Sequence, residues 1–543
     1  MTQQKDPMIP DGAVNPIDTD YQIGQDNVVV KIGPFGLDIH NRVFLISALA
    51  IIAFVILTLV FREEAGPAFT TLRNTLTSNL DWFFLSAANI FVLICLALIV
   101  SPLGKVRLGG TEATPDFSYM GWFSMLFAAG MGIGLMFYGV SEPLTHFGTA
   151  MQGTQFTDGV RTDWAPLGGA AGDSAAAAEL AMAATIFHWA LHPWAIYAIL
   201  ALGLALFSFN KGLPLTIRSV FYPILGERVW GWPGHIIDIL AVFATLFGLA
   251  TSLGFGASQA SAGLTYLFDI PGGTTTQVLL IIGITAIALF SVVAGLEAGV
   301  KRLSEINMVL AALLLLFVII VGPTLAIFSG FTTNLISYLE HLPALSNPIG
   351  REDTNYSQGW TTFYWAWWIS WSPFVGMFIA RVSRGRSVRE FLISVLLIPS
   401  LACVFWMTVF GSTAISQVVQ DGYQAAVEAA LPLQLFAMLD ALPLAQISSF
   451  IAIILVVVFF VTSSDSGSLV IDTIAAGGKV NAPTVQRVFW CTFEGLVAVV
   501  LLLGGGLTAL QAMAVSTGLP FTLVLLAASI AIIKGLMSEP RPD

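Results

Sequence analysis

The sequence predicts an all-α polytopic membrane protein that crosses the bilayer twelve times. Of its 543 residues, 56% are hydrophobic and only 10% are charged, which is not the balance of a soluble globular protein. Apolar stretches close to the roughly 20 residues needed to cross a bilayer recur from end to end. All but four of the 22 Lys and Arg residues fall in alternate connecting segments, which predicts that both termini are cytoplasmic.

Twelve apolar stretches are the candidate spans. They cover residues 43–61, 81–101, 120–146, 182–208, 235–264, 276–295, 304–329, 359–383, 391–414, 445–472, 486–504 and 508–533. The four basic residues left for the outer loops are Arg62, Arg73, Arg161 and Arg351. The first 40 residues are polar and acidic, so we expect no cleavable signal peptide.

Composition and spacing exclude several kinds of function. The net charge of −11 lies mainly in tails and loops, so it does not indicate a nucleic-acid partner. Cys95, Cys403 and Cys491 lie singly in apolar segments and fit neither a disulfide framework nor a metal site. No nucleophile–base pair or metal cluster is evident, so we expect neither an enzyme nor a cofactor.

The third span contains a glycine-rich break. Gly130, Gly132 and Gly134 occupy alternate positions, which disfavours a continuous helix. In lipid, a broken helix persists only where its freed backbone groups meet a cavity, a ligand or an ion. Close helix packing is the alternative, but packing motifs space small residues by four rather than two. The spacing therefore favours an unwound segment.

The eighth span is rich in tryptophan. At about 100° per residue, Trp367, Trp368, Trp371 and Phe374 share one helix face, while Trp365 points elsewhere. Indole faces attract quaternary ammonium cations through the ring quadrupole. A belt at the membrane interface is the alternative, but it would place aromatic residues at both ends of a span. The clustering therefore favours a ligand cage.

The two halves of the chain show corresponding features. Ser372, Pro373 and Gly376 are expected to interrupt the eighth span, five spans after the glycine break and with the opposite orientation in the membrane. Two such broken helices suggest an inverted five-helix repeat with a binding site between them.

Other spans add candidate ligands. Trp189, Trp194 and Tyr197 of the fourth span could complete an aromatic box, whereas His188 and His192 are more often structural. In the tenth span, Thr462 and Ser463 offer hydroxyl ligands for sodium, which carbonyls of Ala128 and Met131 could complete. Asp465 within that span could pair with Arg381 as a gate, and a purely structural pair is an equal alternative.

These motifs together resemble the betaine/choline/carnitine transporter family, over residues 30–534. The resemblance is carried by the glycines at 130–134, by the HWxLHPWAIY run at 188–197, and by the tryptophan run at 360–374. It implies a LeuT-like core of two inverted five-helix repeats preceded by two extra helices. It also implies a homotrimer in the lipid of the bacterial inner membrane, with a trimethylammonium or related onium substrate.

The resemblance also divides the chain. A cytoplasmic tail covers 1–42, two peripheral membrane helices 43–119, the first repeat 120–330, an outer loop with a short amphipathic helix 331–358, the second repeat 359–534, and a short cytoplasmic C-terminus 535–543.

Site residues carry over from the family motifs. Trp189, Trp194, Tyr197 and Trp368 would form the central cage, Trp367, Trp371 and Phe374 the route inward, and Ala129 and Ser252 further substrate contacts. Ala128, Met131, Phe459, Thr462 and Ser463 would bind sodium, and Thr245 with Phe374 a second sodium ion.

The expected function is sodium-coupled uptake of a zwitterionic onium compound, with glycine betaine favoured over dimethylsulfoniopropionate, carnitine and choline. A betaine-binding membrane sensor is the alternative of another class, and a channel is disfavoured because an aromatic cage is no polar pore lining. No Lys or Arg occurs between residues 236 and 300, where sodium-independent relatives carry an Arg. The long basic C-terminal tail of osmoregulated relatives is missing, so we do not expect osmotic activation through such a tail.

Charge type is expected to set the preference among onium substrates. The segment Phe127–Gly139 holds no acid, and Glu142 lies about two turns further towards the outside. Choline-carrying relatives place Asp at the position of Gly134. We therefore expect zwitterions to be preferred over choline, and Gly134→Asp to shift the preference towards choline.

Overall fold

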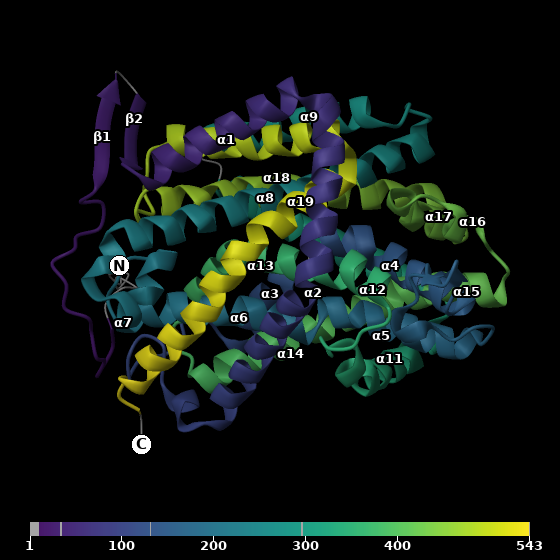
Figure 1. Cartoon of the computed structure of the whole chain (residues 1–543), viewed down its shortest axis with the longest axis horizontal. Coiled ribbons are helices and arrows are strands. Elements are labelled where there is room, and N and C mark those ends of the chain that lie inside the picture. Colours follow the sequence, from purple (N-terminus) through teal and green to yellow (C-terminus); the bar gives the residue numbers. More distant parts are fainter. Residues whose placement is uncertain (1–9, 33–34, 131, 295–296, 542–543) are drawn as a thin grey trace.

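The computed structural model describes residues 10–32, 35–130, 132–294 and 297–541, and it is a bundle of helices (Figure 1). In this described part, the strands are the antiparallel hairpin β1 (Asn27–Ile32) and β2 (Phe35–His40) and the short pair β3 (Phe156–Thr157) and β4 (Val160–Arg161).

The longer helices are α1 (Val43–Val60), α2 (Arg62–Val100), α3 (Tyr119–Gly130), α4 (Ile133–Gln152), α5 (Ser174–Trp189), α6 (Leu191–Ala205), α8 (Trp232–Phe268), α9 (Thr274–Ala294), α10 (Glu297–Val321), α11 (Thr324–Leu345), α13 (Thr362–Val382), α14 (Val388–Met407), α15 (Thr413–Gln420), α18 (Ala445–Ala475) and α19 (Thr484–Met537). The short helices are α7 (Tyr222–Leu225), α12 (Thr354–Tyr356), α16 (Ala425–Glu428) and α17 (Gln434–Asp440).

The third predicted span is divided at the glycines. Helix α3 ends at Gly130, α4 begins at Ile133, and the two axes differ by 64°. Gly132 has an extended backbone, with φ −174° and ψ −171°. Helical hydrogen bonding therefore stops where the glycine spacing predicts the break.

The fourth span is also divided, although nothing in its sequence pattern predicted a break. Helix α5 ends at Trp189 and α6 begins at Leu191, with non-helical angles at Ala190. Pro193 has no N–H for the Trp189 carbonyl four residues earlier. The indole Nε1 of Trp194 donates to that carbonyl instead, at 3.2 Å.

The predicted interruption of the eighth span is wrong. Helix α13 runs without a break through Pro373 and Gly376. Pro373 cannot donate to the Ile369 carbonyl, but the Ser372 hydroxyl does so at 2.7 Å. The carbonyl that proline leaves free is satisfied locally, so the helix continues.

Two helices extend into segments that we expected to lie in outer loops. Residues 62–80 belong to α2, which begins at Arg62. Gly66 of α2 lies close to Gly504 of α19. A Cβ on Gly66 would lie 2.9 Å from the Gly504 carbonyl oxygen. The seventh predicted span, 304–329, is divided by Pro323, so α11 extends into the predicted outer loop.

Nine helices in the described ranges are long and apolar enough to cross a membrane, or ten when α3 and α4 form one bent span. Helix α19 changes direction at Gly505 and Gly506, between the last two predicted spans. Counting α19 as two spans and adding the 21-residue α13 would give the expected twelve, and that number stays a prediction.

Helix α13 lies inside the bundle. It packs against α6, α8 and α19 (Figure 1). Helix α18 packs against α8 and α10. The two ends of the chain meet on one face, where Lys211 Nζ binds both the Asn15 carbonyl and the Ser538 hydroxyl, at 2.9 and 2.8 Å.

Candidate substrate and ion site

A cavity of about 1140 Å³ lies among α3, α4, α5, α6, α8, α10, α13 and α18. Fifteen of the expected site residues line it, namely Ala128, Ala129, Trp189, Trp194, Tyr197, Ser252, Trp367, Trp368, Trp371, Phe374, Arg381, Phe459, Thr462, Ser463 and Asp465. Met131 lies outside the described residues, and Thr245 does not line the cavity.

The expected cage residues surround one end of this cavity. The Trp368 ring lies 5.0 Å from that of Trp189 and 6.2 Å from that of Tyr197, each at a steep angle, and Trp194 lies 5.4 Å from Tyr197. Trp367 stacks on Trp368 at 4.7 Å. Such a set of crossed aromatic faces suits a cation that cannot donate hydrogen bonds.

The indole N–H groups of the α13 tryptophans that line the cavity are bound to the protein. Trp368 Nε1 donates to the His188 carbonyl at 2.8 Å, and Trp367 Nε1 donates to the Ser252 hydroxyl at 3.2 Å. Trp371 Nε1 donates to the Gly248 carbonyl at 2.9 Å. These bonds fix the rings by their edges, so a ligand meets aromatic faces instead of competing donors.

Gly134 lies against the cage rings. A Cβ at this position would be 2.8 Å from Cη2 of Trp189 and 3.0 Å from Cη2 of Trp367. Any side chain at position 134 would therefore displace these rings. An Asp there would disturb the cage as well as add charge, which complicates the expected shift towards choline.

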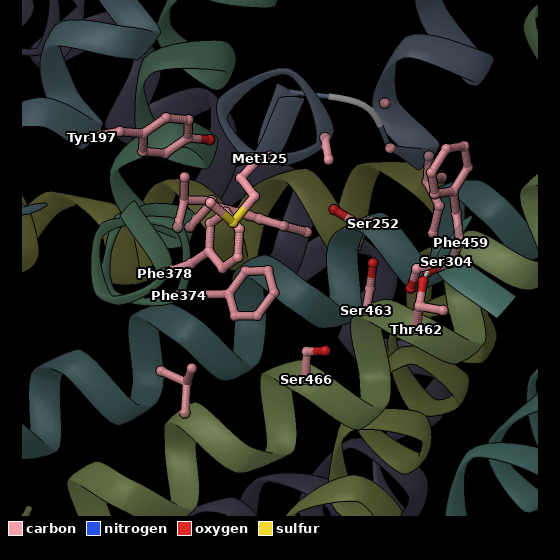
Figure 2. A pocket seen from close by; sticks show the side chains of 18 of the residues that line it. Met125, Tyr197, Ser252, Ser304, Phe374, Phe378, Phe459, Thr462, Ser463 and Ser466 are labelled. Carbon is pink, nitrogen blue, oxygen red and sulfur yellow. Dashed lines mark hydrogen bonds between the residues drawn. The ribbon is translucent and has the colours of Figure 1, made fainter. Parts of the chain in front are cut away.

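The expected sodium ligands lie along another part of the cavity. Figure 2 shows Phe459, Thr462 and Ser463 on one helix, α18, with Tyr197 and Phe374 elsewhere in the same pocket. The Thr462 hydroxyl donates to the Val458 carbonyl at 3.0 Å, which leaves its oxygen lone pairs for a cation.

The second expected sodium pair is not brought together around the cavity. Thr245 is fully buried and donates to the Ala241 carbonyl at 2.7 Å. Phe374 lines the cavity, whereas Thr245 does not.

The expected contact between Arg381 and Asp465 is absent from the described structure, although both residues line the cavity. The Asp465 carboxylate pairs with Arg487 of α19 and accepts a hydrogen bond from Ser291 at 3.0 Å. The position of Arg487 depends on helix packing, which sequence order does not show. Lys301, with 78% of its side chain exposed, also lines the cavity, so this end reaches solvent.

Sequence reasoning missed further lining residues, three of which helical spacing indicates. Met125 precedes Ala128 by one turn, Phe378 follows Phe374 by one turn, and Ser466 follows Ser463 by one turn. Ser304 of α10 also lines the cavity, without any such signal (Figure 2).

A buried polar cluster behind the cage was also missed. Ligand atoms of Glu142, His146 and His188 lie within 4.8 Å of one another, a composition that also suits a metal ion. His188 Nδ1 lies only 2.6 Å from Glu142 Oε1. A shared ion with bonds of about 2.0 Å would hold these atoms further apart, so the distance indicates a hydrogen bond. The three cysteines are unpaired and buried.

A membrane-embedded helix bundle with an aromatic cavity among its broken helices is the architecture of a small-molecule transporter. The sequence profile of the betaine/carnitine/choline family transporters matches residues 42–541. The chain belongs to this family, which confirms the resemblance, and it is a transporter and not an enzyme.

Individual relatives agree with this assignment. A glycine betaine/proline/choline transporter of Vibrio parahaemolyticus is 73% identical, over 98% of this chain and 96% of the relative. The glycine betaine transporter 1 of the same organism is 54% identical, over 96% of this chain and 97% of the relative. A glycine betaine transporter of Bacillus subtilis is 43% identical, over 86% of this chain and 88% of the relative.

Proposed function

We propose that this protein is a sodium-coupled symporter that takes up glycine betaine or a closely related onium compound by alternating access. The observation that carries the proposal is the cage of Trp189, Trp194, Tyr197 and Trp368 in one cavity with the Thr462 and Ser463 hydroxyls. Aromatic faces suit the onium group, and hydroxyl and carbonyl oxygens suit sodium. Two of the relatives are named glycine betaine transporters without a further substrate.

Choline is the second candidate substrate. The 73% identical relative is named for glycine betaine, proline and choline, so our expectation that zwitterions are preferred needs a direct test. Competition of unlabelled choline, carnitine, proline and dimethylsulfoniopropionate against labelled glycine betaine ranks these ligands. If choline inhibits the uptake of labelled glycine betaine as strongly as the same concentration of unlabelled glycine betaine does, the expected preference is contradicted.

Uptake into proteoliposomes tests the coupling. We expect labelled glycine betaine to accumulate above its external concentration when sodium is higher outside, and not when potassium replaces sodium. Equilibration without accumulation would indicate a channel, and binding without any flux would indicate a sensor. Accumulation that does not depend on sodium would indicate an onium transporter with another driving force.

The family resemblance supports the arrangement proposed around this site. We infer a LeuT-like pair of inverted five-helix repeats, a homotrimer in the bacterial inner membrane, and both termini in the cytoplasm. The contact between Asn15 and Ser538 is consistent with termini on one side of the membrane, because the two ends share one face of the bundle. Labelling of single cysteines placed near each terminus, from each side of the membrane, tests the orientation.

A further inference from the structure

Glu142 of α4 is a fully buried carboxylate directly behind the cage. Its Oε2 atom lies 2.8 Å from Trp189 Nε1 and 2.5 Å from the Tyr364 hydroxyl. Its Oε1 atom lies 2.6 Å from His188 Nδ1 and 3.3 Å from His146 Nε2. One side chain of the broken span therefore joins α5 and α13, the helices that carry Trp189 and Trp368 of the cage.

The four groups within hydrogen-bonding distance of Glu142 can all act as donors, as an ionised carboxylate requires. A carboxylate offers about four acceptor sites and no donor, and two neighbours on each oxygen fill them. Trp189 Nε1 can only donate. His146 Nδ1 is buried without a hydrogen-bond partner among the described residues, which fits a neutral imidazole that donates from Nε2.

His188 can be neutral as well. Its Nε2 atom lies 2.9 Å from the Thr361 hydroxyl and 3.4 Å from the Tyr356 hydroxyl, and either hydroxyl can donate to a neutral ring. In this arrangement the cluster of Glu142, His146 and His188 carries one net negative charge.

Trp189 connects this charge to the cage. A hydrogen bond from an indole N–H to a carboxylate is charge-assisted, and it polarises the ring that donates it. Added electron density on the ring strengthens the attraction of its face for a cation. The other indoles of the cage donate to neutral groups, since Trp194 Nε1 bonds the Trp189 carbonyl and Trp368 Nε1 bonds the His188 carbonyl.

We propose that Glu142 supplies the counter-charge of the onium cage, as a positioning residue that fixes and polarises Trp189. This inference rests on the proposed onium transport and names a determinant of its substrate class. It also revises the expectation from the sequence, in which Glu142 was placed too far along the helix to matter. A carboxylate behind the cage favours a net cation more than a zwitterion, because the zwitterion brings its own negative group.

A double-mutant cycle tests the proposal on the purified full-length protein. Affinities for choline and glycine betaine are measured by calorimetry for the wild type, Glu142→Gln, Trp189→Phe and the double variant. We expect Glu142→Gln to weaken choline binding about tenfold and glycine betaine binding about threefold. Once Trp189→Phe has removed the indole N–H, adding Glu142→Gln should change choline affinity by less than about twofold.

Trp194→Phe is the matched control, because Trp194 donates its N–H to a backbone carbonyl instead of a carboxylate. We expect Trp189→Phe to lower the ratio of choline affinity to glycine betaine affinity, and Trp194→Phe to leave that ratio unchanged. This comparison keeps Glu142 in place, so it decides the question even when Glu142→Gln does not fold.

Two results would overturn the inference. One is an equal loss for both ligands in Glu142→Gln that adds in full to the effect of Trp189→Phe, since Glu142 would then act only on the fold. The other is an unchanged ligand ratio in Trp189→Phe. Either result leaves the proposed function intact when the wild type binds onium compounds, whereas failure of the wild type to bind them contradicts the proposed function itself.

Discussion

Two tryptophans of α13 lie in different surroundings. Trp368 donates its N–H to a backbone carbonyl and turns its ring to the cavity, where 8% of the residue is exposed. Trp365 is fully buried, stacks on His192 at 5.3 Å, and does not line the cavity. The pair therefore provides a test residue and a matched control within one helix.

We expect Trp368→Ala to weaken glycine betaine binding about thirtyfold, because a desolvated cation–π contact contributes about 2 kcal/mol. Calorimetric titration of the purified protein measures the change. Trp365→Phe, which keeps an aromatic ring at the buried position, should bind like the wild type. An affinity of Trp368→Ala within about twofold of the wild type would remove Trp368 from the site.

The hydroxyls of Thr462 and Ser463 can be tested in the same way. We expect replacement of both by Ala to raise the sodium concentration needed for half-maximal uptake at least about tenfold, because two oxygen ligands are lost. Ser448→Ala is the control, since Ser448 lies on the same helix, bonds its own backbone and does not line the cavity. An unchanged sodium dependence in the double variant would place the ion elsewhere.

At the scale of helices, the two buried prolines near the cage have opposite outcomes. Pro193 and Pro373 each leave one carbonyl without its usual helical donor. The Trp194 indole takes the free carbonyl of Trp189 where the helix turns, and the Ser372 hydroxyl takes that of Ile369 where the helix continues. The two free carbonyls therefore have different donors, an indole N–H where the helix turns and a serine hydroxyl where it continues.

We expect Ser372→Ala to lower the free energy of unfolding by about 1 kcal/mol, because the buried Ile369 carbonyl loses its donor. Ser529→Ala is the control. Ser529 also donates to a helical carbonyl, that of Leu525, but this carbonyl keeps the Ser529 backbone N–H as its partner. Thermal unfolding in detergent measures both variants, and equal melting temperatures would contradict the role of Ser372.

Gly134 lies in the first turn of α4, directly after the break between α3 and α4. We expect Gly134→Ala to weaken onium binding at least about tenfold, because the added Cβ would meet the Trp189 and Trp367 rings. Gly148→Ala, on the same helix α4, should bind normally, since a Cβ there meets no atom within 4 Å. Binding affinity measured by calorimetry compares the two, and wild-type affinity in Gly134→Ala would show that the rings can move freely.

At the scale of the whole molecule, buried polar contacts join segments that lie far apart along the chain. Lys211 Nζ lies 2.5 Å from Glu539 Oε1, with side chains only 2% and 1% exposed. Asn210 Nδ2 donates to the other oxygen of Glu539 at 3.0 Å. These contacts hold the end of α19 against the segment that follows α6.

We expect Glu539→Gln to destabilise the folded protein by about 3 kcal/mol, because Lys211 would remain buried without its counter-charge. Thermal unfolding measures the loss, and Glu63→Gln, at an exposed position of α2, should leave the melting temperature unchanged. A melting temperature of Glu539→Gln equal to that of the wild type would show that water or another group reaches Lys211.

Local patterns in the chain were enough to predict the membrane-spanning character, the glycine break, and the face of α13 that carries Trp367, Trp368, Trp371 and Phe374. Hydropathy and helical periodicity act over neighbouring residues, so both can be read along the sequence. Other lining residues, among them Ala129, Ser252 and Phe459, were expected only because the motifs resemble the transporter family.

Contacts between distant residues could not be read in this way. The rotamer of Ser372 decides whether its hydroxyl reaches the Ile369 carbonyl in α13. Arg487 reaches Asp465 only because α19 packs on α18. The Glu142 carboxylate meets Trp189 across 47 residues of sequence. Burial forces each such polar group to find a partner, and folding in three dimensions decides which partner is within reach.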